Sequence, residues 1–260
     1  MDLICEERNS DEPFIARVWR SQGQAAGPFI SVAETNGELV VTKYRGKTAI
    51  TLRGPSTQAT PAYCPEDAEF FGIQFKPGAF LAHLPAKMVM NRHDLFLPEE
   101  SSKSFWLSGS AWQYPSFENA DHFVKRLVQD GLLVYDPIVE ATLHGQPMQI
   151  SLRTVQRRFL QATGLTHNTL YQIHRAQYAA NFLRQGISIL ETVQRAGYFD
   201  QPHLTRSLKH LIGLTPAQIM DPGRPERLSF LYKKEPPWLY YNTNVLRTMD
   251  IPSPALSTSS

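Results

Sequence analysis

The apolar positions in the second half of the chain recur with a helical period, and one stretch of this pattern occurs twice. Residues 151–166 align with residues 200–215 at a constant offset of 49 residues. At about 100° per residue, the apolar side chains of each copy share one face. These side chains are Leu152, Val155, Phe159 and Ala162 in the first copy, and Leu204, Leu208 and Leu211 in the second. Repeats of this period usually contain one supersecondary unit more than once, and the unit predicted here is a helix-turn-helix.

Capping residues mark the ends of the two predicted helices. Ser151 and Asp200 stand at the N-cap positions, where a short polar side chain can accept a hydrogen bond from a backbone N–H. Gly164 and Gly213 stand where a C-terminal glycine is expected. Both copies therefore carry the start and stop signals of a helix of about three turns.

The faces that point away from the predicted core carry side chains that can recognise base edges. Arginine can donate two hydrogen bonds to guanine O6 and N7, and glutamine can pair with adenine. An outward arginine is usually a solvated charge, but the repeat and its phasing favour base contact for Arg157 and Arg206. For His203 both interpretations stay open. The outward residues are Arg153, Gln156 and Arg157 in the first helix, and His203, Thr205, Arg206 and Lys209 in the second.

A shorter partner helix is predicted before each copy, and a longer helix lies between the copies. Residues 136–143 begin with Asp-Pro, and residues 188–197 begin with the capping box Ser-Ile-Leu-Glu and end in glycine. Residues 168–184 carry a long helical pattern, which predicts a rod of roughly 25 Å. Such a rod would hold two DNA-reading helices near the ~34 Å spacing of successive major grooves.

The first part of the chain has the pattern of strands. Four short apolar or alternating segments, at residues 29–33, 38–43, 48–53 and 70–75, are bounded by Asn-Gly, Arg-Gly, Gly-Pro and Pro-Gly turns. Evenly spaced strands of this length predict a small barrel or sandwich. Residues 116–131 predict a helix that packs on its own domain, contacts a second subunit or couples two domains, and packing on its own domain is the default.

The fold class that follows is α+β. Residues 1–130 are expected to form a mainly-β domain, and residues 131–220 an all-α domain of two helix-turn-helix units joined by a linker helix. Residues 221–260 are a tail in which residues 228–232 are a candidate for docking on a folded domain. The closing residues 251–260 are expected to be disordered, because they are rich in proline and serine.

The distribution of charged residues along the chain is more informative than the net charge. The 260 residues carry a net charge of only +2. Residues 1–130 contain 13 Lys and Arg against 16 Asp and Glu, whereas residues 131–220 contain 8 against 4. Positive charge is thus concentrated where the repeated helices predict a surface that binds phosphate.

The cysteines and the targeting signals exclude several classes of protein. Only Cys5 and Cys64 are present, so neither a disulfide framework nor a four-cysteine zinc site can be built. The first eight residues lack the basic end and apolar run of a signal peptide, and no stretch approaches the ~20 apolar residues of a membrane span. We therefore expect reduced thiols, a cytoplasmic location and no membrane partner.

Several runs of sequence resemble a known family. They are TVQRRF at residues 154–159, TGL at 163–165, AGYFDQPHLTRSLK at 196–209 and GLTPA at 213–217. Over about residues 136–220, the chain resembles the DNA-binding domain of the AraC/XylS family of bacterial transcription regulators. The resemblance implies sequence-specific binding of double-stranded DNA and, in an activator, contact with RNA polymerase.

Carried over position by position, the resemblance assigns seven DNA-binding residues. Pro202, early in the second reading helix, departs from the pattern because it removes a backbone donor, and this puts base contact by that turn in question. For Gln201, as for His203, a solvated side chain stays an open alternative. The assigned residues are Arg153, Gln156 and Arg157 in the first reading helix, and Gln201, His203, Thr205 and Arg206 in the second.

The resemblance is weaker in the amino-terminal domain, where residues 69–78 are similar to the cupin-like sensing and dimerisation domains of such regulators. A small-molecule effector and a homodimer therefore both stay open. His83 and His93 stand alone without a His-x-His pair, so no metal or other cofactor is expected. Four large aromatic residues could line an apolar pocket, although packing is the favoured interpretation: Trp19, Tyr44, Trp106 and Trp112.

Two other functions are alternatives to that of a regulator. A DNA-repair enzyme fused to an AraC-type module would need a cluster of cysteines to hold zinc and accept alkyl groups, and two cysteines cannot supply it. The repeated helices could also bind a protein partner, which predicts no salt-sensitive affinity for DNA. The expectation is therefore a transcription regulator that is not an enzyme.

Overall fold

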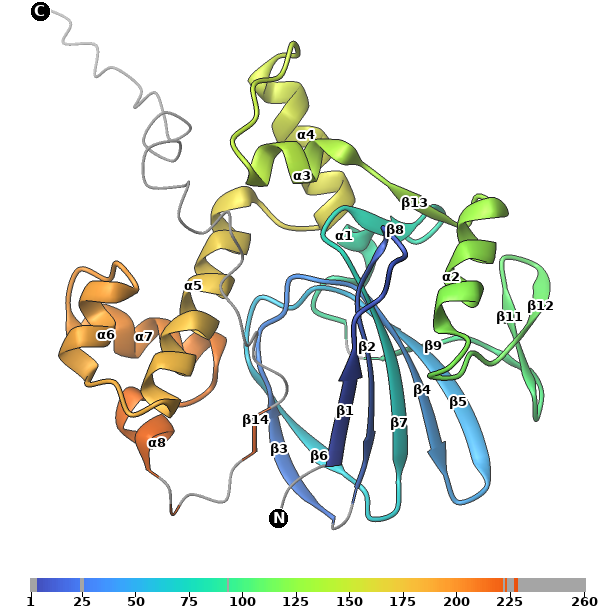
Figure 1. Ribbon diagram of the computed structural model, residues 1–260, viewed down its shortest axis with the longest axis horizontal. Coiled ribbons are helices and arrows are strands. Elements are labelled where there is room, and N and C mark those ends of the chain that lie inside the picture. The colour runs from blue at the N-terminus through green and yellow to red at the C-terminus, as the bar shows by residue number, and fades with distance from the viewer. Residues whose placement is uncertain (1–3, 24–25, 93, 222, 224–226, 229–260) are drawn as a thin grey trace, which may run out of the picture.

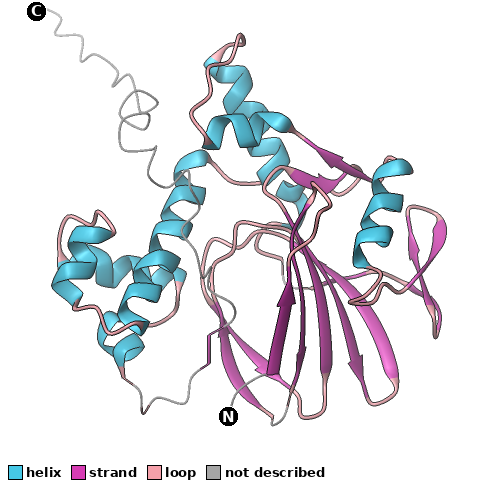
Figure 2. Ribbon diagram, viewed as in Figure 1, coloured by secondary structure: helices cyan, strands magenta, loops and turns pink. Residues whose placement is uncertain are grey.

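A mainly-β domain and a helical domain lie side by side in the computed structural model (Figure 1). The structure describes residues 4–23, 26–92, 94–221, 223 and 227–228. Strands gather on one side of the molecule and most helices on the other, as Figure 2 shows by colour. The predicted α+β class, with strands first and helices second, is confirmed.

The largest sheet of the β domain has six antiparallel strands. In spatial order they are β1 (Ile4–Arg8), β2 (Ile15–Gln22), β7 (Glu69–Phe75), β4 (Glu38–Tyr44), β5 (Lys47–Arg53) and β9 (Leu95–Phe96). Beside it, β3 (Gly27–Ser31) pairs antiparallel with β6 (Thr60–Cys64) and parallel with the short β14 (Arg227–Leu228). The sheet formed by β3 and β6 is the one nearest to the helices α7 and α8 in Figure 1.

Smaller elements complete the β domain. β8 (Ala79–Leu81) pairs with β13 (Leu133–Tyr135). β10 (Glu99–Ser101), β11 (Ser104–Leu107) and β12 (Ser110–Gln113) form a three-stranded sheet. The helices of this domain are α1 (Ala86–Val89) and α2 (Ala120–Gln129).

The core of the β domain follows from the period of two along each strand. Leu39 and Val41 of β4 point to the same face as Ile73 of β7, because successive side chains of a strand alternate between faces. On that face they join Phe123 and Leu127 of α2 in one buried cluster. The helix predicted at residues 116–131 therefore packs against its own domain.

The four predicted strands are confirmed as β3, β4, β5 and β7. Between β4 and β5, Arg45 and Gly46 have φ angles of 48° and 75°, so this is a two-residue turn of the kind that suits the twist of a hairpin. Strands that the pattern did not single out include β1, β2 and β6, whose residues alternate less clearly.

Two boundaries differ from those expected. The α2 helix begins at Ala120 with Asn119 at its N-cap, and Ser116 accepts a hydrogen bond from the Asn119 N–H at 3.3 Å in the preceding turn. Residues 133–135, assigned to the helical domain by the sequence, form β13, because their partner strand β8 lies in the β domain. The expected boundary at residue 130 thus precedes the last strand of the β domain.

The helical domain contains two helix pairs joined by a long helix. The pairs are α3 (Pro137–Leu143) with α4 (Leu152–Thr163), and α6 (Ile189–Arg195) with α7 (Gln201–Leu211); α5 (His167–Arg184) joins them and α8 (Pro216–Met220) follows. The apolar faces predicted for α4 and α7 are buried, except that Leu152 is 45% exposed. As the first residue of α4, it lies beyond the edge of the core.

The tail is described only in part. Leu228 of β14 is partly buried against the core of the helical domain. The other predictions for the tail, on residues 229–260, lie outside the described residues.

Gly72 of β7 lies against the indole of Trp19, a buried residue of β2. A methyl group at Gly72 would overlap three indole atoms, and overpacking of a core costs about 1–3 kcal/mol. We therefore expect Gly72→Ala to lower the free energy of unfolding by about that amount in urea denaturation. Gly27→Ala is the control, because its methyl would meet nothing within 4 Å. Equal midpoints for the two variants would contradict this packing.

Candidate nucleic-acid interface

The helix α4, predicted to be the first reading helix, is fixed at both ends by the residues that the sequence singled out. The Ser151 hydroxyl accepts a hydrogen bond from the Thr154 N–H at 3.3 Å. Gly164 adopts φ 72° and donates its N–H to the Leu160 carbonyl at 2.9 Å. Val155, Phe159 and Ala162 are buried, and the predicted contact residues Arg153, Gln156 and Arg157 are exposed.

Arg158, the neighbour of Arg157, has a different role. Its guanidinium donates two hydrogen bonds to the Asp136 carboxylate, at 2.7 and 2.9 Å. The same carboxylate caps α3 by accepting from the Ile138 N–H at 3.0 Å. Arg158 therefore ties α4 to α3, whereas Arg157 is exposed.

The helix α7, predicted to be the second reading helix, begins in the same way. The Asp200 carboxylate accepts a hydrogen bond from the His203 N–H at 2.7 Å, and Pro202 lies in the first turn, where no intrahelical N–H is required. Leu204, Leu208 and Leu211 are buried. Gln201 and Arg206 are exposed.

Two of the predicted contacts in α7 are half-buried and partly committed to the fold. His203 packs edge-on against the ring of Tyr198, with 5.1 Å between the ring centroids. Burial first, and then the nearby charges of Arg175 and Arg206, lower the pKa of His203, against the opposing effect of Asp200. Thr205 donates its hydroxyl to the Gln201 carbonyl at 2.9 Å. Of the four predicted contacts in α7, Gln201 and Arg206 are thus the two that are exposed.

Arg175 of the linker helix holds the turn between α6 and α7. This largely buried guanidinium lies 4.2 Å from the centroid of the Tyr198 ring and donates to the Gly197 carbonyl at 3.4 Å. The Tyr198 hydroxyl also bonds to the Ser207 hydroxyl at 2.9 Å. Arg175, which the sequence had not singled out, therefore positions the second reading helix on α5 and is not available to DNA.

Comparison with known proteins matches this part of the chain. The model of a helix-turn-helix domain family matches residues 146–221. The HTH-type transcriptional regulator RipA of Corynebacterium diphtheriae is 31% identical over 130 residues. Residues 146–221 form an AraC-type domain.

The comparison covers 48% of this chain but only 36% of RipA, so the chain spans about a third of that relative's length. No solved structure matches the chain. The AraC-type domain contains both reading helices and all seven predicted contact residues, which lie on its exposed or half-exposed surface.

The AraC-type domain is hydrogen-bonded to the β domain through the loop that follows β3. The Ala33 N–H donates to the Leu211 carbonyl at the end of α7, at 2.8 Å, and the Ala33 carbonyl accepts from the Gln177 side chain of α5, at 2.6 Å. The Ala59 N–H donates to the His210 carbonyl at 2.9 Å. Since the last four carbonyls of a helix lack intrahelical partners, the β domain supplies the C-terminal cap of α7.

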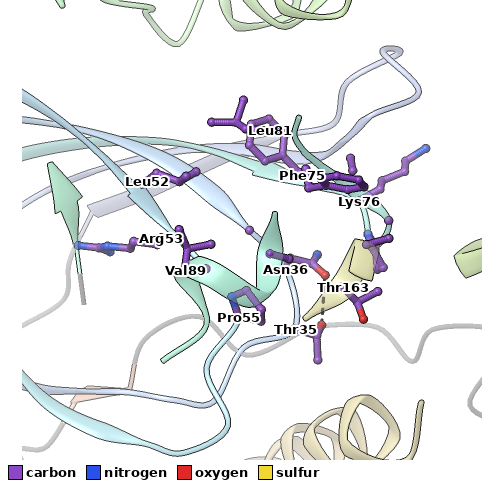
Figure 3. Close-up of a pocket in the computed structure, with 18 of the residues that line it drawn as sticks. Thr35, Asn36, Leu52, Arg53, Pro55, Phe75, Lys76, Leu81, Val89 and Thr163 are labelled. Carbon is purple, nitrogen blue, oxygen red and sulfur yellow. Dashed lines mark hydrogen bonds between the residues drawn. The ribbon is translucent and has the colours of Figure 1, made fainter. Parts of the chain in front are cut away.

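The first reading helix also lies against the β domain. Gly164 at the end of α4 is so close to Ala86 of α1 that a methyl group there would come within 3.0 Å of backbone. A small cavity remains between them, with Asn36, Lys76 and Thr163 in its wall (Figure 3). It encloses about 20 Å³, which is room for one water molecule and not for an effector.

A larger groove lies on the face of the six-stranded sheet that α2 also contacts. It has a volume of about 510 Å³, within the range of ligand pockets, and Lys43, Phe71 and Phe117 contribute to its wall. Among the described residues, no cluster of three or more His, Cys, Asp or Glu could hold a metal ion. No helix within the described ranges is long and apolar enough to cross a membrane.

His174 of α5 makes this domain contact sensitive to pH. Its Nε2 is hydrogen-bonded to the Thr35 hydroxyl at 2.8 Å, and complete burial lowers its pKa to about 3. The folded protein thus keeps His174 neutral, whereas the unfolded chain protonates it below the usual pKa of about 6.5. Stability is therefore full above pH 6.5 and falls as the pH drops toward 3.

We expect the free energy of unfolding to fall by about 2 kcal/mol between pH 7 and pH 5 through His174 alone. Urea denaturation of the unaltered protein and of His174→Gln, each at pH 7 and pH 5, isolates the contribution of His174, because the two proteins have all other titrating groups in common. The variant should show the smaller dependence on pH. Parallel pH profiles for the two proteins would show that His174 is not held neutral by the fold.

Proposed function

We propose that the protein is a transcription regulator that binds a double-stranded DNA site of two parts, with α4 and α7 in two neighbouring major grooves. The observation that carries this proposal is the equivalence of the two reading helices. The offset of 49 residues places Arg157 on Arg206, and both arginines are exposed on helices that begin with a polar cap. A surface that bound only one groove would not need the second copy.

The linker helix supports a spacing suited to adjacent grooves. The 18 residues of α5 span about 27 Å at ~1.5 Å per residue. Two reading helices held at the ends of α5 can have a separation close to the ~34 Å between successive major grooves on one face of B-DNA. The net positive charge of residues 131–220 favours phosphate contact, so affinity should fall steeply with salt.

We propose further that the β domain controls DNA binding by bracing both reading helices. It contacts the end of α4 through Ala86 and the end of α7 through Ala33 and Ala59. A ligand or a second subunit that shifts the loop around Ala33 would therefore change the position of α7 relative to α4. An effector that acts in this way would change the affinity for DNA without contacting the DNA-binding surface.

Selection of bound duplexes from a random pool, at about physiological salt, tests the function. We expect two short motifs about one helical turn apart. Arg157→Ala should relax one base pair of one motif and Arg206→Ala one base pair of the other, each with a loss of about 1–3 kcal/mol, because a bidentate contact to guanine is removed.

Lys125→Ala is the matched control, since it removes one exposed positive charge from α2 of the β domain. It should leave both motifs intact. Uniform weakening on all sequences by an arginine variant would make that arginine a phosphate contact. A pool with no enrichment by the full chain would contradict the function.

A further inference from the structure

Two neighbouring aromatic residues in the turn between α6 and α7 have opposite environments. Tyr198 is 5% exposed and packs against His203 and Arg175. Phe199 is 91% exposed, the largest value of any large apolar side chain among the described residues. The ring of Tyr198 thus packs within the fold, whereas the ring of Phe199 is exposed to solvent.

Phe199 does not pack against the buried residue that a side chain in its position usually contacts. Phe199 directly precedes Asp200, the N-cap of α7, and an apolar residue there often packs on the fourth helical residue. That residue is Leu204, which is fully buried, whereas Phe199 remains exposed. An apolar ring of this size held in water, at the start of a reading helix, therefore has no role in packing this turn.

The internal repeat places a second apolar residue in the same position. Ile150 precedes Ser151, the N-cap of α4, and corresponds to Phe199 under the offset of 49 residues. Its side chain is 42% exposed. Both reading helices thus carry an exposed apolar residue immediately before the cap, and the second helix presents the larger one.

The position of Phe199 points to base edges. In a helix-turn-helix, the first residues of the second helix meet the bases in the major groove. Phosphate groups provide no apolar contact for an aromatic ring. The apolar group on the floor of the major groove is the C5 methyl of thymine. Pro202, also exposed and three residues further on, extends the apolar surface on the first turn of α7.

We infer that Phe199 contacts a thymine methyl group in the half of the DNA site bound by α7, and that Ile150 makes the smaller equivalent contact in the other half. This inference rests on the proposed function. It makes an apolar contact, beside Gln201 and Arg206, a determinant of sequence preference for the second reading helix. It also gives a role to the first turn of α7, where proline has removed a backbone donor.

Replacing thymine by uracil in the selected duplex tests the contact, because uracil lacks the methyl group and keeps the same hydrogen-bonding edge. With the full chain, we expect each contacted thymine in the α7 motif to cost about fourfold in affinity when replaced, the effect of burying one methyl group. Phe199→Ala should bind the thymine duplex more weakly and lose this difference. Because Phe199 is exposed, the variant should fold normally.

Leu190→Ala is the matched control, since Leu190 is 71% exposed near the start of α6, at the other end of that helix from Phe199. It should discriminate uracil from thymine as the unaltered protein does. The inference is overturned if uracil has no effect on the unaltered protein, if Phe199→Ala still discriminates, or if the α7 motif contains no thymine. Failure of the full chain to select any motif would instead overturn the proposed function, and the inference with it.

Discussion

Ala33 is hydrogen-bonded to two helices at once, and the relation between the two domains depends on it. Its N–H caps the end of the second reading helix at Leu211, and its carbonyl accepts from Gln177 of the linker helix. Ala33 is fully buried, so both hydrogen bonds are shielded from water, and each would be exchanged for a bond to water if the domains separated. The loop after β3 is therefore a structural part of the DNA-binding domain, although 144 residues separate Ala33 from Gln177.

The consequence is that the spacing of the reading helices has three supports. The linker helix provides length, Arg175 fixes the α6–α7 turn on that helix, and the β domain contacts the ends of both α4 and α7. Under the proposed function, a small displacement in the β domain would be enough to change DNA binding.

The local features of the helical domain were predictable from sequence, and its long-range contacts were not. Ser151, Asp200 and Gly164 mark helix ends through bonds to neighbours within four residues, so their pattern is visible in the chain. The separate roles of Arg157 and Arg158 depend on Asp136, 22 residues from Arg158, and no periodicity reveals that pair. The strands β1, β2 and β6 were missed for another reason, which is that their apolar and polar residues alternate less clearly.

The most direct test of this account is the affinity of the full chain for a selected two-motif duplex before and after insertion of about five base pairs between the motifs. The insertion rotates one motif by about half a helical turn. If one braced unit carries both reading helices, they cannot follow, and affinity should fall to that of a duplex with a single motif. Unchanged affinity would show that the reading helices move independently, and would contradict the bracing role assigned to the β domain.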